Sequence, residues 1–257
     1  MDGNLKFSVI TVCFNAELEI RKTIESILNQ SYLPYEYIII DGLSNDKTIE
    51  IANEYIDEFN KKNVIYNIYS EKDTGIYNAM NKGINKANGD FISFLNAGDW
   101  YELDALENVN NLYHKNAFDI TYGYINYIKQ DGTSLIKKSK YDKFWTTSRH
   151  WNHPSMFMRT VVYNKECFDE QFKIYSDFEL FLRIKRKKYK ISINKNVVAN
   201  FVADGISTKT NKEIVKKRAE EKYLAYRKNH YSRLYWFEAY GWEKFKSIYF
   251  NIHKKKE

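Results

Sequence analysis

The chain of 257 residues is 44% hydrophobic and 28% charged, and it is rich in aromatic side chains, with 22 Tyr and 16 Phe. This composition is typical of a soluble globular protein with a substantial core, and it excludes an intrinsically disordered chain. No apolar run approaches the roughly 18 residues that span a bilayer, and the N-terminus lacks the basic and apolar regions of a signal peptide. We therefore expect a cytoplasmic protein, either free or held peripherally at the cytoplasmic face of the inner membrane.

The net charge of +7 is concentrated at one end of the chain. Residues 209–257 contain 14 Lys and Arg against 6 Glu, a local charge of +8, so residues 1–208 sum to −1. Cys13 and Cys167 are far apart in the sequence and lack metal-ligand spacing, so we expect reduced thiols and no zinc site.

The N-terminal part alternates between two kinds of segment. Four short runs are apolar at nearly every position, at 7–14, 35–41, 63–70 and 90–96. Three segments between them carry apolar residues at helical spacing, at 20–28, 49–56 and 76–87. Continuous apolar runs predict strands covered on both faces. The alternation predicts βαβ units, and therefore an α/β fold with a mostly parallel central sheet flanked by helices.

From Ala117 the pattern changes. The sequence predicts a hairpin over 119–139 with its turn at 130–133, a helix with an apolar face around 177–186, and one or two strands over 189–202. After Thr208 the spacing is helical, and the residues are basic and aromatic. We therefore divide the chain into a domain at 1–208 and a helical, basic C-terminal extension at 209–257.

Ligands of parallel sheets bind at the carboxyl ends of the strands, so the loops there are the first place to look for chemistry. The run that ends at Asn96 is followed by Ala97, Gly98 and Asp99. A strand-end carboxylate beside glycine suits a divalent cation, because Mg²⁺ and Mn²⁺ prefer oxygen ligands and often take only one or two from the protein. Asp99 is the predicted metal ligand. Ala97 would let the backbone approach a sugar or ribose, and Asn96 would donate or accept a hydrogen bond.

Two other loops of this edge carry carboxylates. Asp41 could accept hydrogen bonds from a base or ribose, or it could only cap its own loop as an Asx-turn. Asp73 and Gly75 precede the third helix, whose N-terminal backbone N–H groups favour negative charge. Lys82 could meet that charge, although a lone lysine on a helix is usually only solvated.

The stretch 172–187 supplies a candidate base. If it is helical, Asp177 lies at the helix start, close to the core and facing the cleft. Group transfer to a hydroxyl needs a base, and a carboxylate within hydrogen-bond reach contributes about 10²- to 10⁴-fold. The alternative is that Asp177 merely caps the helix. His153 could contact the acceptor, or it could be structural.

These motifs together resemble the family 2 glycosyltransferases, which are mostly inverting, nucleotide-sugar-dependent enzymes with the GT-A fold. The resemblance covers about 7–208 and rests on the order of five motifs: FSVITVCFNAE, YIIIDGLSNDKTIEI, SEKDTGIYNAMNKGINKANGDFISFLNAGD, NHPSMFMR and YSDFELFLR. It is strongest for bacterial members that build capsule, O-antigen or exopolysaccharide.

The resemblance implies roles for individual residues. Thr11, Asp41 and Asp73 would line the nucleotide pocket together with Asn15, the NAGD loop would replace the Asp-x-Asp motif, and Asp177 would be the catalytic base. Two departures from the family pattern stand out. Gly42 follows Asp41 where many relatives carry a second Asp, and Asp99 stands as a single carboxylate at the metal site. We expect a donor diphosphate to provide most of the ligands of a Mn²⁺ or Mg²⁺ ion.

The predicted function is therefore an inverting glycosyltransferase that uses a nucleotide-sugar donor, by resemblance a UDP-sugar, and a saccharide or lipid-linked saccharide acceptor. Two alternatives stay open. A sugar nucleotidyltransferase would need a glycine-rich loop after the first strand, where TVCFNAE has none. A non-catalytic adaptor would need only the basic tail.

The aromatic and basic residues of the extension suit the interface of an anionic membrane. They could equally pack on the catalytic domain or form a homodimer contact. Nucleic acid is not an expected partner, because no recognition motif accompanies the charge.

Overall fold

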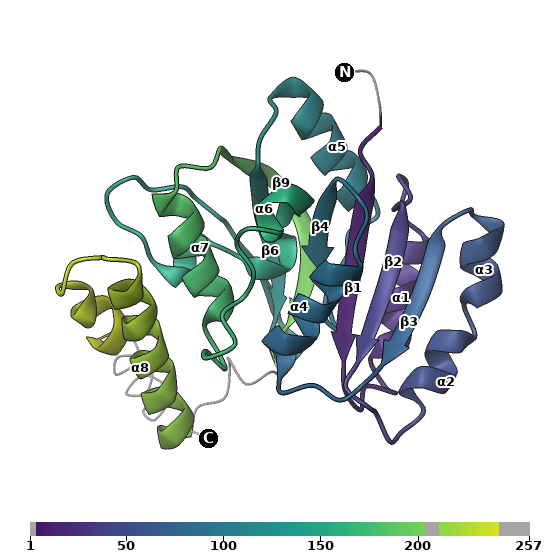
Figure 1. Cartoon of the computed structure of the whole chain (residues 1–257), viewed down its shortest axis with the longest axis horizontal. Coiled ribbons are helices and arrows are strands. Elements are labelled where there is room, and N and C mark those ends of the chain that lie inside the picture. Colours follow the sequence, from purple (N-terminus) through teal and green to yellow (C-terminus); the bar gives the residue numbers. More distant parts are fainter. Residues whose placement is uncertain (1–3, 204–210, 242–257) are drawn as a thin grey trace.

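One mixed sheet forms the centre of the molecule (Figure 1). The computed structural model describes residues 4–203 and 211–241. Within them the strand order is β3-β2-β1-β4-β8-β6-β9-β5, and β7 pairs with β6 outside this path. Strands β8, β5 and β7 run antiparallel to their neighbours, and the other pairings are parallel. The α/β fold with a mostly parallel sheet is therefore as the sequence predicts.

The first four strands and the helices between them form the predicted βαβ units. The strands are β1 (Phe7–Cys13), β2 (Glu36–Asp41), β3 (Ile65–Ser70) and β4 (Phe91–Phe94), and the helices are α1 (Ile20–Leu28), α2 (Thr48–Asn53), α3 (Ile56–Lys61) and α4 (Ile76–Lys86). Helix α1 buries Ile20, Ile24 and Ile27, which share one face at helical spacing. The second predicted helix is divided at Tyr55 into α2 and α3.

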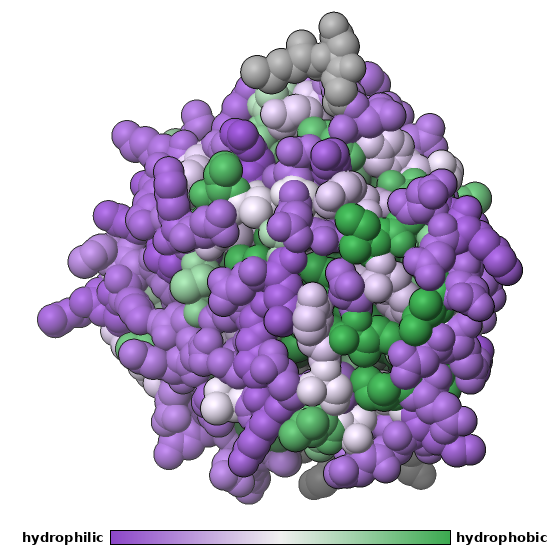
Figure 2. Space-filling view, turned by 45° about the vertical axis from the view of Figure 1, so that its right-hand side comes forward, coloured by the Kyte–Doolittle hydropathy of each residue, from purple (hydrophilic) through white to green (hydrophobic). Residues whose placement is uncertain are grey.

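Strand β3 differs from its prediction. Its apolar run predicts a strand covered on both faces, yet it lies at the edge of the sheet and none of its residues is fully buried. A surface view that brings this side of the molecule forward is mostly hydrophilic, with hydrophobic side chains gathered in its right half (Figure 2). Aromatic and β-branched residues suit edge strands as well as central ones, so the composition of β3 could not show whether it lies at the edge or in the middle of the sheet.

The second half of the chain completes the sheet. Its elements are β5 (Trp100–Tyr101), α5 (Ala105–Lys115), β6 (Ile120–Ile128), β7 (Ser134–Lys137), 3₁₀ turns at Ser148–His150 and His153–Ser155, β8 (Phe157–Arg159), α6 (Thr160–Tyr163), α7 (Ser176–Arg186) and β9 (Ile191–Val202). The predicted hairpin is β6–β7, and the predicted helix is α7. The stretch 189–202 forms one long strand.

The core lies on both faces of the sheet. Successive residues of β1 point to opposite sides, so Ile10 and Val12 pack with α4 and α7, whereas Val9 and Cys13 pack with α1 and α5. Strand β1 is buried along its whole length. The parallel strands therefore hold their carboxyl ends, and the loops that follow them, in fixed positions.

The described part of the C-terminal extension packs on this core. Helix α8 (Lys212–Lys228) lies against α7 and is followed by a π-helical turn (Phe237–Gly241). Tyr226 is fully buried, and its hydroxyl donates to the Thr146 carbonyl at 2.8 Å. Lys222 and Glu238 form a buried ion pair at 3.0 Å. The predicted boundary at 208 falls among residues 204–210, outside the described residues.

Two further expectations are answered by the fold. Cys13 and Cys167 are free thiols. No helix within 4–203 or 211–241 is both long enough and apolar enough to cross a bilayer.

Candidate active site

The loops that follow β1 and β2 are joined into one hydrogen-bonded unit. Asn15 has a left-handed backbone, with φ of 49°, and its N–H donates to Ser44 Oγ at 2.8 Å. Its side-chain Oδ1 in turn accepts from the Asn45 N–H at 2.9 Å. Asn15 therefore joins the two loops, and its predicted donor contact stays a proposal.

Asp41 is fully buried at the end of β2. Its carboxylate accepts from the Ser44 N–H at 3.0 Å, from the Ser44 hydroxyl, and from the Ser70 hydroxyl at 2.6 Å. These contacts are those of a loop cap, which is the alternative that the sequence left open. A donor contact would have to displace a serine hydroxyl.

Thr11 is buried in the middle of β1 with no exposed surface. Its hydroxyl accepts from Tyr37 Oη at 2.9 Å, which links β1 to β2 inside the core. In this structure the Thr11 side chain is therefore paired inside the core, and its predicted place in the nucleotide pocket stays a proposal. A polar residue in a strand can be satisfied by a neighbouring strand, and the sequence gives no sign of that partner.

Beside these loops lies Asp73, half-buried, with Oδ1 accepting from the Gly75 N–H at 2.9 Å. A Cβ on Gly42 would lie 2.7 Å from Asp73 Oδ2, so no larger residue fits there unless Asp73 moves. This close approach gives a physical reason for glycine where many relatives have aspartate. Phe14 packs against Gly42 and is 60% exposed. Sequence reasoning had placed Phe14 inside a strand and missed it as a candidate ring for stacking on a base.

Gly75 precedes the first residue of α4, and Lys82 lies within the helix. Gly75 immediately precedes the helix with φ of 134°, a conformation that favours glycine. Lys82 Nζ donates to the Lys72 carbonyl at 2.7 Å and lies 3.6 Å from a Glu71 carboxylate oxygen. In this structure Lys82 binds the loop that precedes α4. To contact the negative charge of a nucleotide donor, its ammonium group would have to leave Lys72 and Glu71.

The NAGD loop is fixed from two sides. The Asp99 N–H donates to the Asn96 carbonyl at 3.1 Å, which closes a tight turn in which Gly98 has φ of 97°. Thr23 of α1 accepts from the Gly98 N–H at 3.0 Å and donates to the Asp99 carbonyl at 2.7 Å. Asp99 Oδ1 accepts from the Val202 N–H at 3.0 Å. The carboxylate is thereby held between α1 and the end of β9.

The oxygen donors of this loop fit a divalent cation that takes few protein ligands. Asn96 Oδ1 is buried and has no hydrogen-bond partner among the described residues, and Asp99 lies in the same turn. Carboxylate and amide oxygens are suitable ligands for Mg²⁺ and Mn²⁺. Within 4–203 and 211–241 no group of three or more His, Cys, Asp and Glu side chains could hold a metal. A cation here would depend on oxygens from a bound ligand.

Asp177 lies in the first turn of α7, as predicted. Its Oδ1 accepts from the Phe178 N–H at 2.8 Å and lies 3.2 Å from the Tyr77 hydroxyl. Burial raises the pKa of Asp177, while nearby His153 and these hydrogen bonds oppose the rise. A carboxylate that binds its proton more tightly than usual is a better base once ionised.

His153 lies close enough to Asp177 for their charges to interact. Its ring is enclosed by Phe94, Trp151 and Phe168, with ring centroids 5.8–6.1 Å away. Burial lowers the pKa of His153, partly offset by Asp177. Its Nε2 is buried without a hydrogen-bond partner in the described chain. The structure thus brings the two predicted residues together and leaves one ring nitrogen of His153 without a partner among the described residues.

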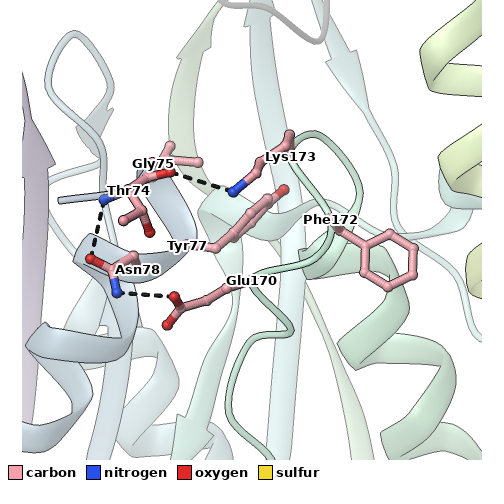
Figure 3. Close-up of a pocket in the computed structure, with 8 residues that line it drawn as sticks. Thr74, Gly75, Tyr77, Asn78, Glu170, Phe172 and Lys173 are labelled. Atoms are coloured by element: carbon pink, nitrogen blue, oxygen red, sulfur yellow. Dashed lines mark hydrogen bonds between the residues drawn. The ribbon is translucent and has the colours of Figure 1, made fainter.

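The segment that leads to Asp177 is clamped onto α4. Asn81 donates to the Phe168 carbonyl and accepts from the Phe168 N–H, both at 3.0 Å. The Tyr77 hydroxyl donates to the Ile174 carbonyl at 2.7 Å. A pocket of about 240 Å³ lies in this clamp (Figure 3). The figure shows Asn78 turned toward Glu170, to which it donates at 3.0 Å, and Phe172 turned away.

The C-terminal extension holds the same segment from another side. The Glu221 carboxylate of α8 accepts from three successive backbone N–H groups, those of residues 173–175, at 2.8–3.1 Å. These residues immediately precede α7. The position of Asp177 therefore depends on α4 and α8 together, and the extension is part of the site's framework.

The family model described as glycosyl transferase family 2 matches residues 8–178, which is more than half of the chain and extends through Asp177. This chain is a family 2 glycosyltransferase. The match includes the four strand-end loops and reaches the start of α7, so it covers the candidate metal loop and Asp177, while Val202 and Glu221 lie beyond it.

Curated relatives agree with this assignment. The transferase is 31% identical over 255 residues to a dolichyl N-acetyl-alpha-D-glucosaminyl phosphate 3-beta-D-2,3-diacetamido-2,3-dideoxy-beta-D-glucuronosyltransferase of Methanococcus voltae, covering 90% of this chain and 77% of the relative. It is 34% identical over 132 residues to the putative teichuronic acid biosynthesis glycosyltransferase TuaG of Bacillus subtilis, covering 51% of this chain and half of TuaG.

Solved structures show the same GT-A fold. The transferase resembles S. aureus TarS 1-349 in complex with UDP, with a TM-score of 0.63 and 17% identity over 92% of this chain and 70% of TarS. It also resembles the mannosyltransferase PcManGT of Pyrobaculum calidifontis in complex with GDP-Man and Mn²⁺, with a TM-score of 0.66 and 14% identity over 88% of this chain and 64% of PcManGT.

The supports of the transferase's candidate base were missed by sequence reasoning. Tyr77 and Asn81 stood in a quoted motif, but their partners lie 87 to 100 residues away. Glu221 stood in a tail that was considered only for its charge and aromatic residues. The sequence did offer one signal for these supports. Asn81 is a polar residue of α4 that stands close to the buried residues Met80 and Ile84, which suggests that its amide has a partner in the fold.

Proposed function

We propose that the protein is an inverting glycosyltransferase that moves a sugar from a nucleoside diphosphate donor, a UDP-sugar, to a hydroxyl of a saccharide or lipid-linked saccharide. The reaction would serve the synthesis of a bacterial surface polysaccharide. The observation that carries the proposal is the environment of Asp177, a half-buried carboxylate with a raised pKa at the start of α7.

The donor side of the proposal uses the loops after β1, β3 and β4. Phe14 offers an exposed ring for a base, and Asp73 offers a carboxylate beside it. Asn96 and Asp99 would hold Mn²⁺ or Mg²⁺ together with the donor diphosphate. When bound, the cation would stabilise the negative charge that develops on the departing diphosphate.

The base side completes the reaction. Asp177 removes the proton of the acceptor hydroxyl, whose oxygen then forms a bond to the anomeric carbon. The bond from that carbon to the phosphate oxygen breaks, and the nucleoside diphosphate leaves with the electron pair. Because attack and departure occur on opposite faces of the sugar, the anomeric configuration inverts. His153, with Nε2 buried and unpaired within the described chain, would orient the acceptor.

The choice of donor and acceptor is supported by similar proteins. TarS has been solved with UDP and with UDP-GlcNAc, and PcManGT with GDP-Man and Mn²⁺. The Methanococcus voltae relative acts on a dolichyl phosphate-linked sugar by its name, and TuaG is assigned to teichuronic acid biosynthesis. Together they favour a nucleotide-sugar donor and an acceptor destined for a cell-surface polymer.

The test is thermal stabilisation by a panel of nucleoside diphosphates, with and without Mn²⁺. Ligand at 100 times its Kd raises stability by about 2.7 kcal/mol, so the shift is readily measured. We expect stabilisation by UDP that needs Mn²⁺ and is lost in Asp99→Asn. Asp57→Asn, a change of an exposed aspartate on α3, is the matched control and should respond like the parent protein.

Two results would contradict the proposal. Absence of any shift with every diphosphate would refute the donor site. A product whose anomeric carbon keeps the donor's configuration, read by the proton coupling constant in NMR, would refute inversion.

A further inference from the structure

Two segments far apart in the sequence expose large apolar side chains. Phe144 is 93% exposed, Phe237 is 67% exposed and Leu234 is 64% exposed, while Trp145 and Trp236 are each almost half exposed. Single exposed apolar residues are common on protein surfaces, but a group of five that includes four Phe or Trp side chains marks an interaction site. We call these five residues the apolar patch.

The two segments lie against each other because Tyr235 joins them. Its ring stacks on Trp145, with centroids 4.5 Å apart and planes inclined by 15°. Its hydroxyl accepts from the Thr146 N–H at 3.0 Å. Tyr235 itself is buried, so it fixes the segments while its chain neighbours face outward. The apolar patch therefore belongs to the packed part of the extension.

The loop that carries Phe144 has a defined conformation. Asp142 Oδ1 accepts from the backbone N–H groups of Phe144 and Trp145, both at 2.9 Å. Lys185 of α7 donates to the Asp142 carbonyl and to the Thr146 hydroxyl. The loop is thus tied to α7 while it holds a phenylalanine ring almost entirely in solvent. Such an arrangement exposes apolar area without a folding reason, which points to a partner.

The charges around the apolar patch identify the kind of partner. Lys140, Lys143 and Arg233 are exposed within the same two segments. The carboxylates there are occupied: Asp142 caps the loop, and Glu238 is buried against Lys222. Beyond Gly241 the sequence continues with further aromatic residues and lysines. Aromatic rings bordered by Lys and Arg suit the headgroup region of an anionic membrane.

A second copy of this chain is a poorer partner for the same surface. A two-fold dimer would place the patch against itself, and so bring Lys143 and Arg233 of one copy into the same interface as those of the other. Like charges brought together in an interface disfavour it. We therefore propose that the apolar patch docks the enzyme on an anionic lipid surface, with Phe144, Trp236 and Phe237 at headgroup level and Lys143 and Arg233 on the lipid phosphates.

This proposal goes beyond the proposed reaction, and it is tested without any substrate. The full chain is mixed with vesicles of phosphatidylcholine alone or with 30% phosphatidylglycerol, and bound protein is separated by sedimentation. We expect binding only to the phosphatidylglycerol vesicles, weakening as salt is raised, because salt screens the attraction. The double variant Phe144→Ser, Phe237→Ser should lose binding by about tenfold or more, because apolar area no longer enters the interface.

The matched control removes equally exposed apolar side chains elsewhere. Leu18 and Leu103 are 86% and 64% exposed, and Leu18→Ser, Leu103→Ser should bind vesicles like the parent protein. Trp fluorescence gives a second readout, since Trp145 and Trp236 should be quenched by brominated lipid. Equal binding by the patch variant and the parent would overturn the proposal. The proposal would also be overturned if the parent protein bound neither kind of vesicle and was a dimer by light scattering, while the patch variant was a monomer.

Discussion

On the β1–β2 side of the active site, buried polar groups are paired within the protein, as Asp41 is with Ser44 and Ser70. On the α7 side several are left without a hydrogen-bond partner among the described residues, including His153 Nε2, Tyr163 Oη and Ser176 Oγ. A buried polar group without a partner costs about 1–3 kcal/mol. The comparison teaches that the first region, which we call finished, pairs its buried polar groups internally, whereas the second, which we call unfinished, leaves several of them without a partner in the described chain.

The largest expected effect comes from Asp177, in the unfinished region. Asp177→Asn should lower kcat by about 10²- to 10⁴-fold, because the acceptor hydroxyl loses its base. The measurement is turnover of a UDP-sugar under saturating donor, once the donor has been identified by stabilisation. Activity within a few-fold of the parent would show that Asp177 only caps α7.

The same variant should not be less stable. Burial raises the pKa of Asp177, so the folded protein binds this proton more tightly than the unfolded chain does. The resulting stabilisation is complete below the ordinary pKa of about 4 and is lost as the pH rises through the raised value. Asp177→Asn should therefore melt at or above the parent's temperature at neutral pH, and this difference should disappear in acid.

A smaller effect on turnover is expected from the framework of the unfinished region. Glu221→Gln removes the charge that accepts from three backbone N–H groups before α7, so the first turn should be held less firmly. We expect kcat to fall about tenfold, less than the roughly 10²-fold that a 1 Å misplacement can cost. Glu220→Gln is the control, because the ion pair that Glu220 forms with Lys216 is exposed. An equal fall of kcat in the two variants would show that Glu221 does not help to position the first turn of α7.

The smallest effect on turnover is expected in the finished region. Asp41→Asn places an amide N–H₂ among the donors of Ser44 and Ser70, so the free energy of unfolding should drop by about 1–3 kcal/mol. Urea unfolding measures this loss, with Asp104→Asn, at an exposed position, as control. Turnover at saturating donor should stay near the parent's. A KM for donor that rises tenfold with unchanged stability would instead make Asp41 a donor contact.

Local sequence patterns predicted the parts of the fold that they determine. The apolar runs at 7–14, 35–41 and 90–96 became central parallel strands, and Asp99 and Asp177 lie at a strand-end loop and a helix start, as predicted. Strand β5 has two residues, too few to show a period, and its partner is β9 near the other end of the chain. The sequence could not predict it.

The supports of the site were unpredictable for the same reason. Tyr77 meets Asp177 across 100 residues, and Thr11 is occupied by Tyr37 on a neighbouring strand. Neither contact leaves a local pattern, because each depends on which elements the finished fold places side by side. The candidate role of Phe14 could have been predicted, because it is an aromatic residue one position beyond the end of β1.

The hydrogen bond from the Val202 N–H to Asp99 has a consequence for synthesis of the protein. These residues are 103 positions apart, and among the described strands β5 joins the sheet through β9. Strands β1 to β4 are complete in a growing chain once Phe94 has been added, but the NAGD loop lacks its contact with β9 until Val202 follows. Contacts of such long sequence separation form late. Donor binding is therefore expected only after nearly the whole transferase has been made, so an incomplete chain would not sequester nucleotide sugar.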